Sequence, residues 1–206
     1  MRTTTPLRRA LITVTATAAV VLTATGSAVA VPVSGTAAAP HATAPSLSPL
    51  RPVVELAAER LATADLVAAA KWGTDSPIDD PAREQQVLDN VAAQAQQLGA
   101  DPDEIRVIFR DQIEANKIVQ RGLFQRWTDH PDQAPTTKPD LSAVRQEINR
   151  VTSALVEALA TTADDRGAFT CRPELALAAL QVHHEDHLDA LHTRALARAL
   201  HSVCGS

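Results

Sequence analysis

The sequence predicts an all-α protein, a bundle of about five to six helices arranged around one long central helix. Of its 206 residues 45% are hydrophobic, but only three are Phe, two are Trp and none is Tyr. The core must therefore be built from Ala, Leu, Val and Ile, and so much alanine favours closely packed helices over sheets. Apolar residues at helical spacing, with no glycine between Asp101 and Gly122, predict the central helix at 101–127.

The first 30 residues have the pattern of a cleavable secretory signal. Three arginines accompany an apolar run at 10–23, and a small-residue Ala-Val-Ala cleavage site follows at 28–30. The run is too short to span a bilayer, so we expect no membrane association after cleavage and a secreted or periplasmic protein. Residues 31–48, rich in Pro, Ala, Ser and Thr, are predicted to be a flexible linker to a helical domain at 49–206.

The charge of the mature chain argues against a nucleic-acid partner. Removing the leader takes away three arginines and no acids, so the formal charge goes from 19 − 24 = −5 to 16 − 24 = −8. An acidic protein does not attract a polyanion, and a cluster of basic residues inside it must serve a local purpose.

The two cysteines, Cys171 and Cys204, both lie in the part of the chain that would be exported. An even pair in an oxidising compartment most simply forms one disulfide, which on the chain-entropy model contributes about 3–4 kcal/mol. A reactive thiol pair is the alternative, although the sequence has no CxxC motif.

The first helix is predicted from about Ser48 to Trp72, after a cap and a first-turn proline at Ser48 and Pro49. Arg60 and Lys71 lie eleven residues apart on it, three turns plus about 20°, so both project from one side and border its apolar stripe. They indicate either a shared anion site or two surface cations whose stems cover apolar neighbours.

The second helix is predicted to begin at Asp79-Asp80-Pro81 and to stop at Gly99. Arg83 and Glu84 fall in its first turns. Glu84 complements the helix dipole there, whereas Arg83 opposes it, so Arg83 needs a reason beyond helix stability.

The central helix places three amides on its inward face. Asp101 is its predicted cap, with Glu104 at the capping-box position. Gln112, Asn116 and Gln120 share the face of the apolar stripe, and an unpaired buried amide costs about 1–3 kcal/mol. These amides must meet each other, water or a polar ligand, which leaves open both a satisfied polar network and a binding site.

A Pro-rich connection leads to a fourth helix, capped by Asp140 and flanked on its apolar stripe by Arg145. Residues 161–172 are predicted to be a loop. One last helix is then predicted from Pro173 to about Val203, with leucines on its packed faces that include Leu177 and Leu180.

A histidine-rich run, HHEDH, lies within that last helix and puts His183 and His187 at i, i+4. It lacks the HExxH order of zinc proteases, because the position four after His184 is Leu188. We therefore expect a solvated polar face and no metal site.

The polar residues that border the inward faces form one constellation from four helices: Arg60, Lys71, Arg83, Arg145, Asn116 and Gln120. Four cations around amides describe a pocket for a small dianion. The sequence offers no nucleophile paired with a base and no glycine-rich phosphate loop. The pocket therefore either binds or catalyses by electrostatics and orientation alone.

Four stretches closely resemble the all-helical, type II-like chorismate mutases, and specifically their secreted class: AERLATADLVAAAKW, SPIDDPAREQQVL, ADPDEIRVIFRDQIEANKIVQRGLFQRW and PDLSAVRQEINR. The resemblance runs motif by motif over about residues 50–150, and the leader, the two cysteines and the C-terminal helix extend it. It implies a homodimeric isomerase of the shikimate pathway, in aromatic amino acid biosynthesis. Such an enzyme rearranges chorismate to prephenate in one unimolecular Claisen step without a cofactor.

Carried over position by position, the resemblance implies roles for the cations and for one amide. Lys71 and Gln120 are similar to the catalytic pair that hydrogen-bonds the substrate ether oxygen as its C–O bond breaks. Arg60 and Arg145 are similar to the clamps for the substrate carboxylates, and Arg83 to a further substrate-binding and catalytic arginine.

The same resemblance implies that Asp80 and Glu84 lie near the substrate hydroxyl and that Asn116 makes a polar contact with the substrate. Gln120 departs from relatives that carry Glu at this position. A Glu must be protonated to donate a hydrogen bond, whereas Gln donates at any ordinary pH, so the pH dependence of those relatives does not transfer.

The implied division of the domain places the active-site helices at 49–160 and a disulfide-pinned C-terminal helix at 161–206. Arg145 is supplied by the same chain after the Pro-rich connection, so each chain could hold a complete site.

Two other functions remain open: a lyase similar to isochorismate pyruvate lyases, which would release pyruvate, and an exported, non-catalytic binding module.

Overall fold

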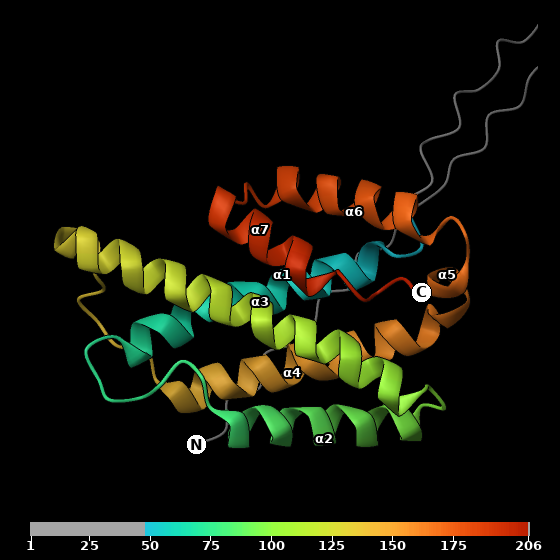
Figure 1. The fold of residues 1–206 in the computed structure, drawn as a ribbon, viewed down its shortest axis with the longest axis horizontal. Helices are drawn as coiled ribbons and strands as arrows, with labels where there is room; N and C mark the ends of the chain where they lie inside the picture. The colour runs from blue at the N-terminus through green and yellow to red at the C-terminus, as the bar shows by residue number, and fades with distance from the viewer. Residues whose placement is uncertain (1–47, 206) are drawn as a thin grey trace, which may run out of the picture. The chain divides into compact units, whose positions relative to one another are not determined.

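The computed structural model describes residues 48–205, and the predicted signal at 1–30 and linker up to residue 47 lie outside the described residues. Within 48–205 the chain forms α-helices and one 3₁₀ turn, and no strand. The elements are α1 (Arg51–Lys71), α2 (Pro81–Gln97), α3 (Pro102–Asp129), η1 (Pro131–Gln133), α4 (Leu141–Thr161), α5 (Ala163–Gly167), α6 (Cys171–Glu185) and α7 (Ala190–Ala199) (Figure 1). The predicted all-α fold with a long central helix is confirmed, with α3 as that helix.

Aspartate caps begin the helices that carry most of the predicted site. Asp80 accepts from the backbone N–H of Arg83 at 3.0 Å, and Asp101 accepts from that of Asp103 at 2.8 Å. Prolines follow both caps, where a missing N–H is harmless. The capping box expected at Glu104 does not form, because its carboxylate pairs with Arg166 instead.

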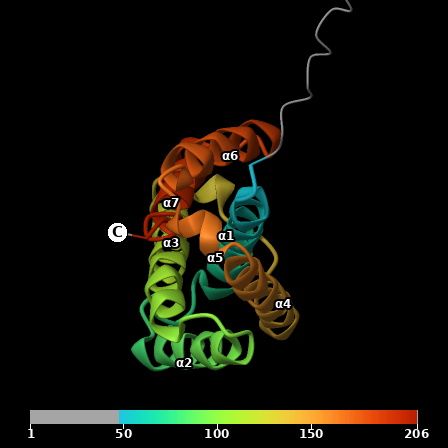
Figure 2. The same ribbon diagram turned by 90° about the vertical axis from the view of Figure 1, so that its right-hand side faces the viewer.

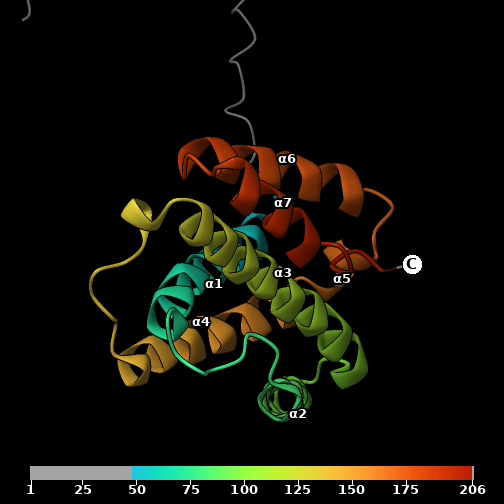
Figure 3. The same cartoon turned by 60° about the vertical axis from the view of Figure 1, so that its left-hand side comes forward.

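The described helices are organised around α3, which packs against α1, α2 and α7, while α1 also packs against α4 and α6. Figure 2 shows α6 and α7 at one end and α2 at the other, with α3 between them. Figure 3 shows α2 end-on beneath α3 and α4, both of which it contacts. One face of α3 therefore packs against α2 and another packs against α7.

Small residues allow close approach at two helix contacts. Ala57, Ala64 and Ala68 of α1 have 0% exposure, so this helix packs its backbone tightly against its neighbours. Gly122 lies within the continuous helix α3, where a Cβ would lie 2.6 Å from Cδ1 of Leu191 in the first turn of α7.

The prediction of one continuous helix from Pro173 to about Val203 is wrong. The chain turns between α6 and α7, where His187 adopts φ 52°, and Asp189 caps α7 by accepting from the N–H of His192 at 2.8 Å. This turn folds α7 back against α3. The leucines predicted to lie on one helix are divided between α6 and α7. Leu177 and Leu180, which were expected to pack, are 50% and 66% exposed.

The predicted disulfide is confirmed: Cys171 and Cys204 are bonded, with their Cα atoms 5.8 Å apart. The predicted loop at 161–172 contains the short helix α5, whose Arg166 is 2% exposed. Arg166 donates to the carbonyl of Leu159 at 3.2 Å and pairs with Glu104, so it ties α3, α4 and α5 together. None of the helices within 48–205 is long and apolar enough to cross a membrane.

Candidate active site

A cavity of about 280 Å³ opens between α1, α2, α3 and the start of α4. All of the predicted catalytic and substrate-binding residues line it: Arg60, Lys71, Asp80, Arg83, Glu84, Asn116, Gln120 and Arg145. Helical spacing and the aspartate caps bring these side chains together from sequence positions as far apart as 60 and 145. Apolar side chains, among them Val67, Ile113 and Val144, complete the walls.

Arg60 is the most deeply held cation of the cavity, with 5% exposure. Its Nε donates to Oγ1 of Thr152 at 3.3 Å and its Nη1 to the carbonyl of Gln112 at 3.2 Å. The guanidinium carbon lies 5.6 Å from the ring centroid of Phe109. Burial lowers the pKa of Arg60 to about 10, so the side chain keeps its charge at neutral pH. The structure thus presents a fixed cation before any ligand arrives.

Lys71 ends α1 and reaches the cavity beside the α1–α2 loop. Its Nζ donates to the carbonyl of Pro77 at 2.8 Å. Burial lowers the pKa of Lys71, while the nearby carboxylates of Asp80 and Asp79 act in the opposite direction and Arg145 reinforces the lowering. The ammonium has two further protons to offer a ligand.

The three amides of α3 divide between two roles. Gln112 donates through Nε2 to the carbonyl of Ala199 at 3.1 Å, which satisfies it at the contact with α7, and it does not line the cavity. Gln120 donates to Oδ1 of Asn116 at 2.9 Å, and both line the cavity. The Oε1 atom of Gln120 is buried without a hydrogen-bond partner in the described structure. A satisfied polar network thus accounts for Gln112, whereas the other two face the cavity.

The two remaining arginines lie at the exposed rim. Arg83 donates from Nη1 to Gln86 at 3.3 Å, and Arg145 projects from the first turns of α4. Arg83 opposes the dipole of α2 in its first turn, and the structure places it in the lining of the cavity. Long exposed side chains of this kind can close over a bound anion.

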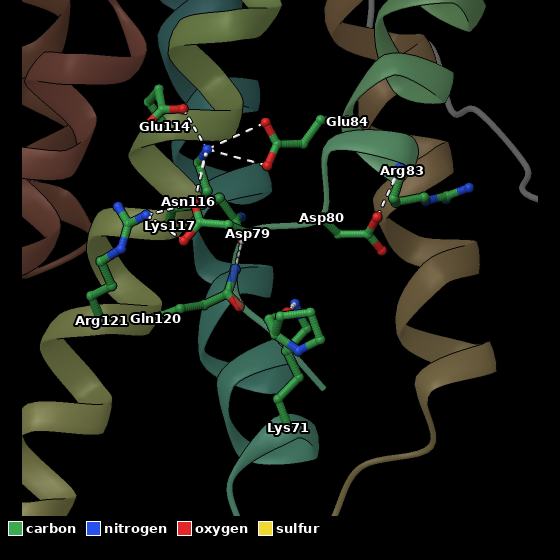
Figure 4. A network of polar contacts seen from close by, with 11 residues as sticks. Lys71, Asp79, Asp80, Arg83, Glu84, Glu114, Asn116, Lys117, Gln120 and Arg121 are labelled. Atoms are coloured by element: carbon green, nitrogen blue, oxygen red, sulfur yellow. Dashed lines mark hydrogen bonds and ion pairs between the residues drawn. The ribbon is translucent and has the colours of Figure 1, made fainter. Parts of the chain in front are cut away.

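Sequence reasoning missed Lys117, which also lines the cavity and is 8% exposed. Its Nζ lies 3.2 Å from Glu84, 3.3 Å from Asp79 and 2.5 Å from Glu114 (Figure 4). Its position between Asn116 and Gln120 in the run ANKIVQ was the available signal. With Lys117 the lining holds five basic and two acidic side chains, a formal balance of 5 − 2 = +3.

This arrangement suits a small organic dianion. Cations at the rim and in the depth can hold two carboxylates, and Lys71 and Gln120 offer donors to a third oxygen between them. Within residues 48–205 no group of three or more His, Cys, Asp or Glu side chains is placed to hold a metal ion. The pair expected at i, i+4, His183 and His187, does not lie on one helix, because α6 ends at Glu185.

Comparison with known proteins gives the family. The family described as "Chorismate mutase type II" matches residues 51–121. A secreted chorismate mutase of Mycolicibacterium smegmatis is 41% identical over 80% of this chain and 91% of its own length. A secreted chorismate mutase of Mycobacterium tuberculosis is 36% identical over 80% of this chain and 83% of its own length.

The fold agrees with these sequence matches. The crystal structure of a chorismate mutase from Burkholderia phymatum aligns with a TM-score of 0.74 and 35% identity, over 78% of this chain and 98% of that one. With this identity over most of both sequences and a shared all-helical fold, the chain belongs to the type II chorismate mutase family.

Proposed function

We propose that the protein rearranges chorismate to prephenate in the cavity between α1, α2, α3 and α4. The observation that carries the proposal is the convergence of eight side chains, all expected from the family resemblance, on one cavity. The reaction is a [3,3] rearrangement within one molecule, so it needs neither a nucleophile nor a cofactor.

In this reaction the transition state develops negative charge on the ether oxygen as the C–O bond breaks. Lys71 and Gln120 donate hydrogen bonds to that oxygen, which stabilises the transition state more than the ground state. Gln120 keeps one Nε2 proton on Asn116 and has a second for the substrate. Asn116 thereby also orients the amide that it contacts.

The arginines hold the substrate in its reactive, folded conformer. Arg60 binds one carboxylate from a preassembled position, and Arg145 closes on the other from the rim, with Arg83 as a further contact. Fixing both carboxylates is an orientation effect that removes much of the entropic barrier. Asp80 and Glu84 accept from the substrate hydroxyl.

We also propose that the protein acts outside the cytoplasm and as a homodimer. The predicted leader at 1–30 and the disulfide favour action outside the cytoplasm, and two relatives of this chain are named secreted chorismate mutases. A homodimer in which each chain holds a complete cavity is the expected assembly. The active-site part extends from 49 to 160 and the disulfide-pinned part from 161 to 206.

The direct test is a spectrophotometric assay of chorismate loss with the mature protein, followed by identification of the product. Prephenate as the sole product supports the proposal. Release of pyruvate would instead assign a lyase, and binding of chorismate without turnover would leave a non-catalytic binding module. Either result contradicts the proposed reaction.

A further inference from the structure

Five charged side chains meet where α3 faces the α1–α2 loop and the start of α2 (Figure 4). We call them the Lys117 cluster: Asp79, Glu84, Glu114, Lys117 and Arg121. Lys117 is its centre, because its Nζ contacts all three carboxylates. Arg121 lies at its outer edge, paired with Asp79 at 2.6 Å, and does not line the cavity.

Lys117 is a permanent cation in a position that shields it from water. Its side chain is 10% exposed and that of Glu84 is 27% exposed. Burial alone acts to lower the pKa of Lys117, but its bonds to Glu114, Glu84 and Asp79 outweigh this effect and raise the pKa above its usual value. The cluster therefore favours the charged form of the lysine.

Glu84 receives Lys117 on both carboxylate oxygens, with Nζ 3.2 Å from Oε1 and 3.3 Å from Oε2. No other side-chain hydrogen bond to Glu84 is present in the part of the chain that the structure describes. Glu84 also lines the cavity, so the contact with Lys117 sets the direction in which the carboxylate faces. Removing the lysine leaves a free carboxylate next to a site for a dianion.

We propose that Lys117 is a positioning residue for substrate binding that acts through Glu84. It holds the Glu84 carboxylate at the cavity wall and offsets part of its charge, so that Glu84 accepts a hydrogen bond from the substrate hydroxyl with less repulsion of the two substrate carboxylates. This role rests on the proposed function of the cavity. It requires no contact between Lys117 and the substrate.

The expected signature is an effect on KM and not on kcat. The hydroxyl is on the ring carbon next to the one whose C–O bond breaks, but its own bonds do not change in the reaction, so we expect its contact with Glu84 to differ little between the ground state and the transition state. Loss of such uniform binding raises KM and leaves kcat nearly unchanged. A defect confined to folding would instead lower the active fraction and hence the apparent kcat.

The test is a double-mutant cycle between Lys117 and Glu84, measured as chorismate turnover. In the wild-type background, Lys117→Met should raise KM about tenfold, the effect of one charge-assisted hydrogen bond, with kcat within about twofold. In the Glu84→Gln background, Lys117→Met should change KM by less than about twofold, because the carboxylate through which Lys117 acts on the substrate is already absent. Lys117→Arg should restore most of the affinity.

A matched control comes from the same cluster. Arg121→Met breaks the pair with Asp79 but leaves Glu84 and Lys117 in contact, so KM should stay within about twofold of wild type. If Arg121→Met raises KM as much as Lys117→Met, the cluster acts by general support of the loop and the proposal is overturned.

Equal KM effects of Lys117→Met in both backgrounds would also overturn the proposal, since Lys117 would then act independently of Glu84. Circular dichroism checks each variant, and Lys117→Gln repeats the cycle if the methionine variant does not fold. A wild type that fails to convert chorismate refutes the proposed function itself, whereas an active wild type with independent effects refutes only the role of Lys117.

Discussion

Lys71 and Gln120 reach the cavity from different helices, and each donates a hydrogen bond to a different kind of acceptor. Lys71 is held by a backbone carbonyl of the α1–α2 loop, whereas Gln120 is held by Asn116 one turn earlier on α3. Contacts within the chain thus already hold both proposed donors in place. Preorganised donors need little rearrangement as charge develops, which is the condition for large rate effects.

We predict that Lys71→Met lowers kcat by about 10²–10³-fold, because a preorganised donor to developing charge contributes about 3–4 kcal/mol. Methionine keeps most of the buried stem, so the variant should remain folded. Steady-state kinetics, with circular dichroism as the folding check, measures the effect. Turnover close to that of wild type would remove this face of α1 from the chemistry.

Gln120→Glu should make activity depend on pH. An ionised carboxylate cannot donate to the ether oxygen and repels its growing charge, and at 4% exposure burial favours the protonated form. The kcat/KM of the variant should therefore decline as pH rises from about 5 to 8, while that of wild type stays flat. Parallel profiles would mean that Gln120 does not face the reacting oxygen.

At the scale of elements, α7 is attached to the rest of the bundle by a charged contact at its first turn. His192 lies 2.7 Å from Asp189, which caps the helix, and 3.2 Å from Asp65 of α1. The hydrogen bond to Asp65 is the largest influence that raises its pKa, with Asp189 adding to it against the effect of burial, and the result is a pKa of about 9. The histidine is therefore protonated at neutral pH.

This contact predicts a pH-dependent stability. Because the folded-state pKa of His192 lies above its usual 6.5, its contribution is complete below about pH 6.5 and is lost as pH rises through about 9. His192→Gln should lower Tm by about 2–4 °C at pH 6, the shift expected for about 1 kcal/mol, and by progressively less up to about pH 10.

Thermal melts of the His192 variant and wild type across this pH range measure the difference. The exposed His184, changed to Gln, is the control and should give no such pH-dependent difference. A constant difference between wild type and the His192 variant from pH 6 to 10 would contradict the role of its charge.

Helix ends could be predicted from the sequence wherever a capping residue stood at the start of a run of apolar residues with helical spacing. Asp101 and Asp140 each cap a helix as expected, and Asp80 caps the helix predicted to begin at 79–81, because a local pattern decides such ends. The turn between α6 and α7 was missed because its leucines continue a helical spacing across it. Only the packing of α7 on α3 decides where that helix stops.

Some residues of the candidate site could likewise be predicted from the sequence, and others could not. Five of the eight cavity residues could be found because they lie on or beside an apolar stripe whose direction the sequence reveals: Arg60, Lys71, Asn116, Gln120 and Arg145. Arg83 stood out because it opposes its helix dipole, and Asp80 and Glu84 came from the family resemblance. Lys117 was missed although it lies between Asn116 and Gln120, since a lysine beside a buried face is ambiguous until α2 brings Glu84 to it. Glu104 was misjudged for a related reason: a distant buried arginine competes with the local cap.

At the scale of the whole described domain, the cavity and the disulfide lie on different parts of the bundle. Cys171 and Cys204 enclose α6 and α7, while the cavity is lined by α1 to α4 and the α1–α2 loop. The bond closes a sequence separation of 33 residues, which on the chain-entropy model stabilises the fold by about 3–4 kcal/mol. Stability and catalysis should therefore be separable.

We predict that changing both cysteines to serine lowers Tm on the order of 10 °C but leaves kcat and KM of the folded protein nearly unchanged. Calorimetry and chorismate assays well below the new Tm measure the two effects. A chorismate-like ligand should recover part of the lost Tm, because it binds only the folded state. Loss of activity without unfolding would mean that α6 or α7 takes part in the site.

The closely packed alanines of α1 have a consequence for redesign of the pocket. Ala57, Ala64 and Ala68 are fully enclosed, and the same helix carries Arg60 and Lys71. A larger side chain at any of the three would push the helix outward and displace both cations together. A directed-evolution library aimed at new substrates should therefore keep α1 constant and vary the rim around Arg145, where added volume projects into solvent.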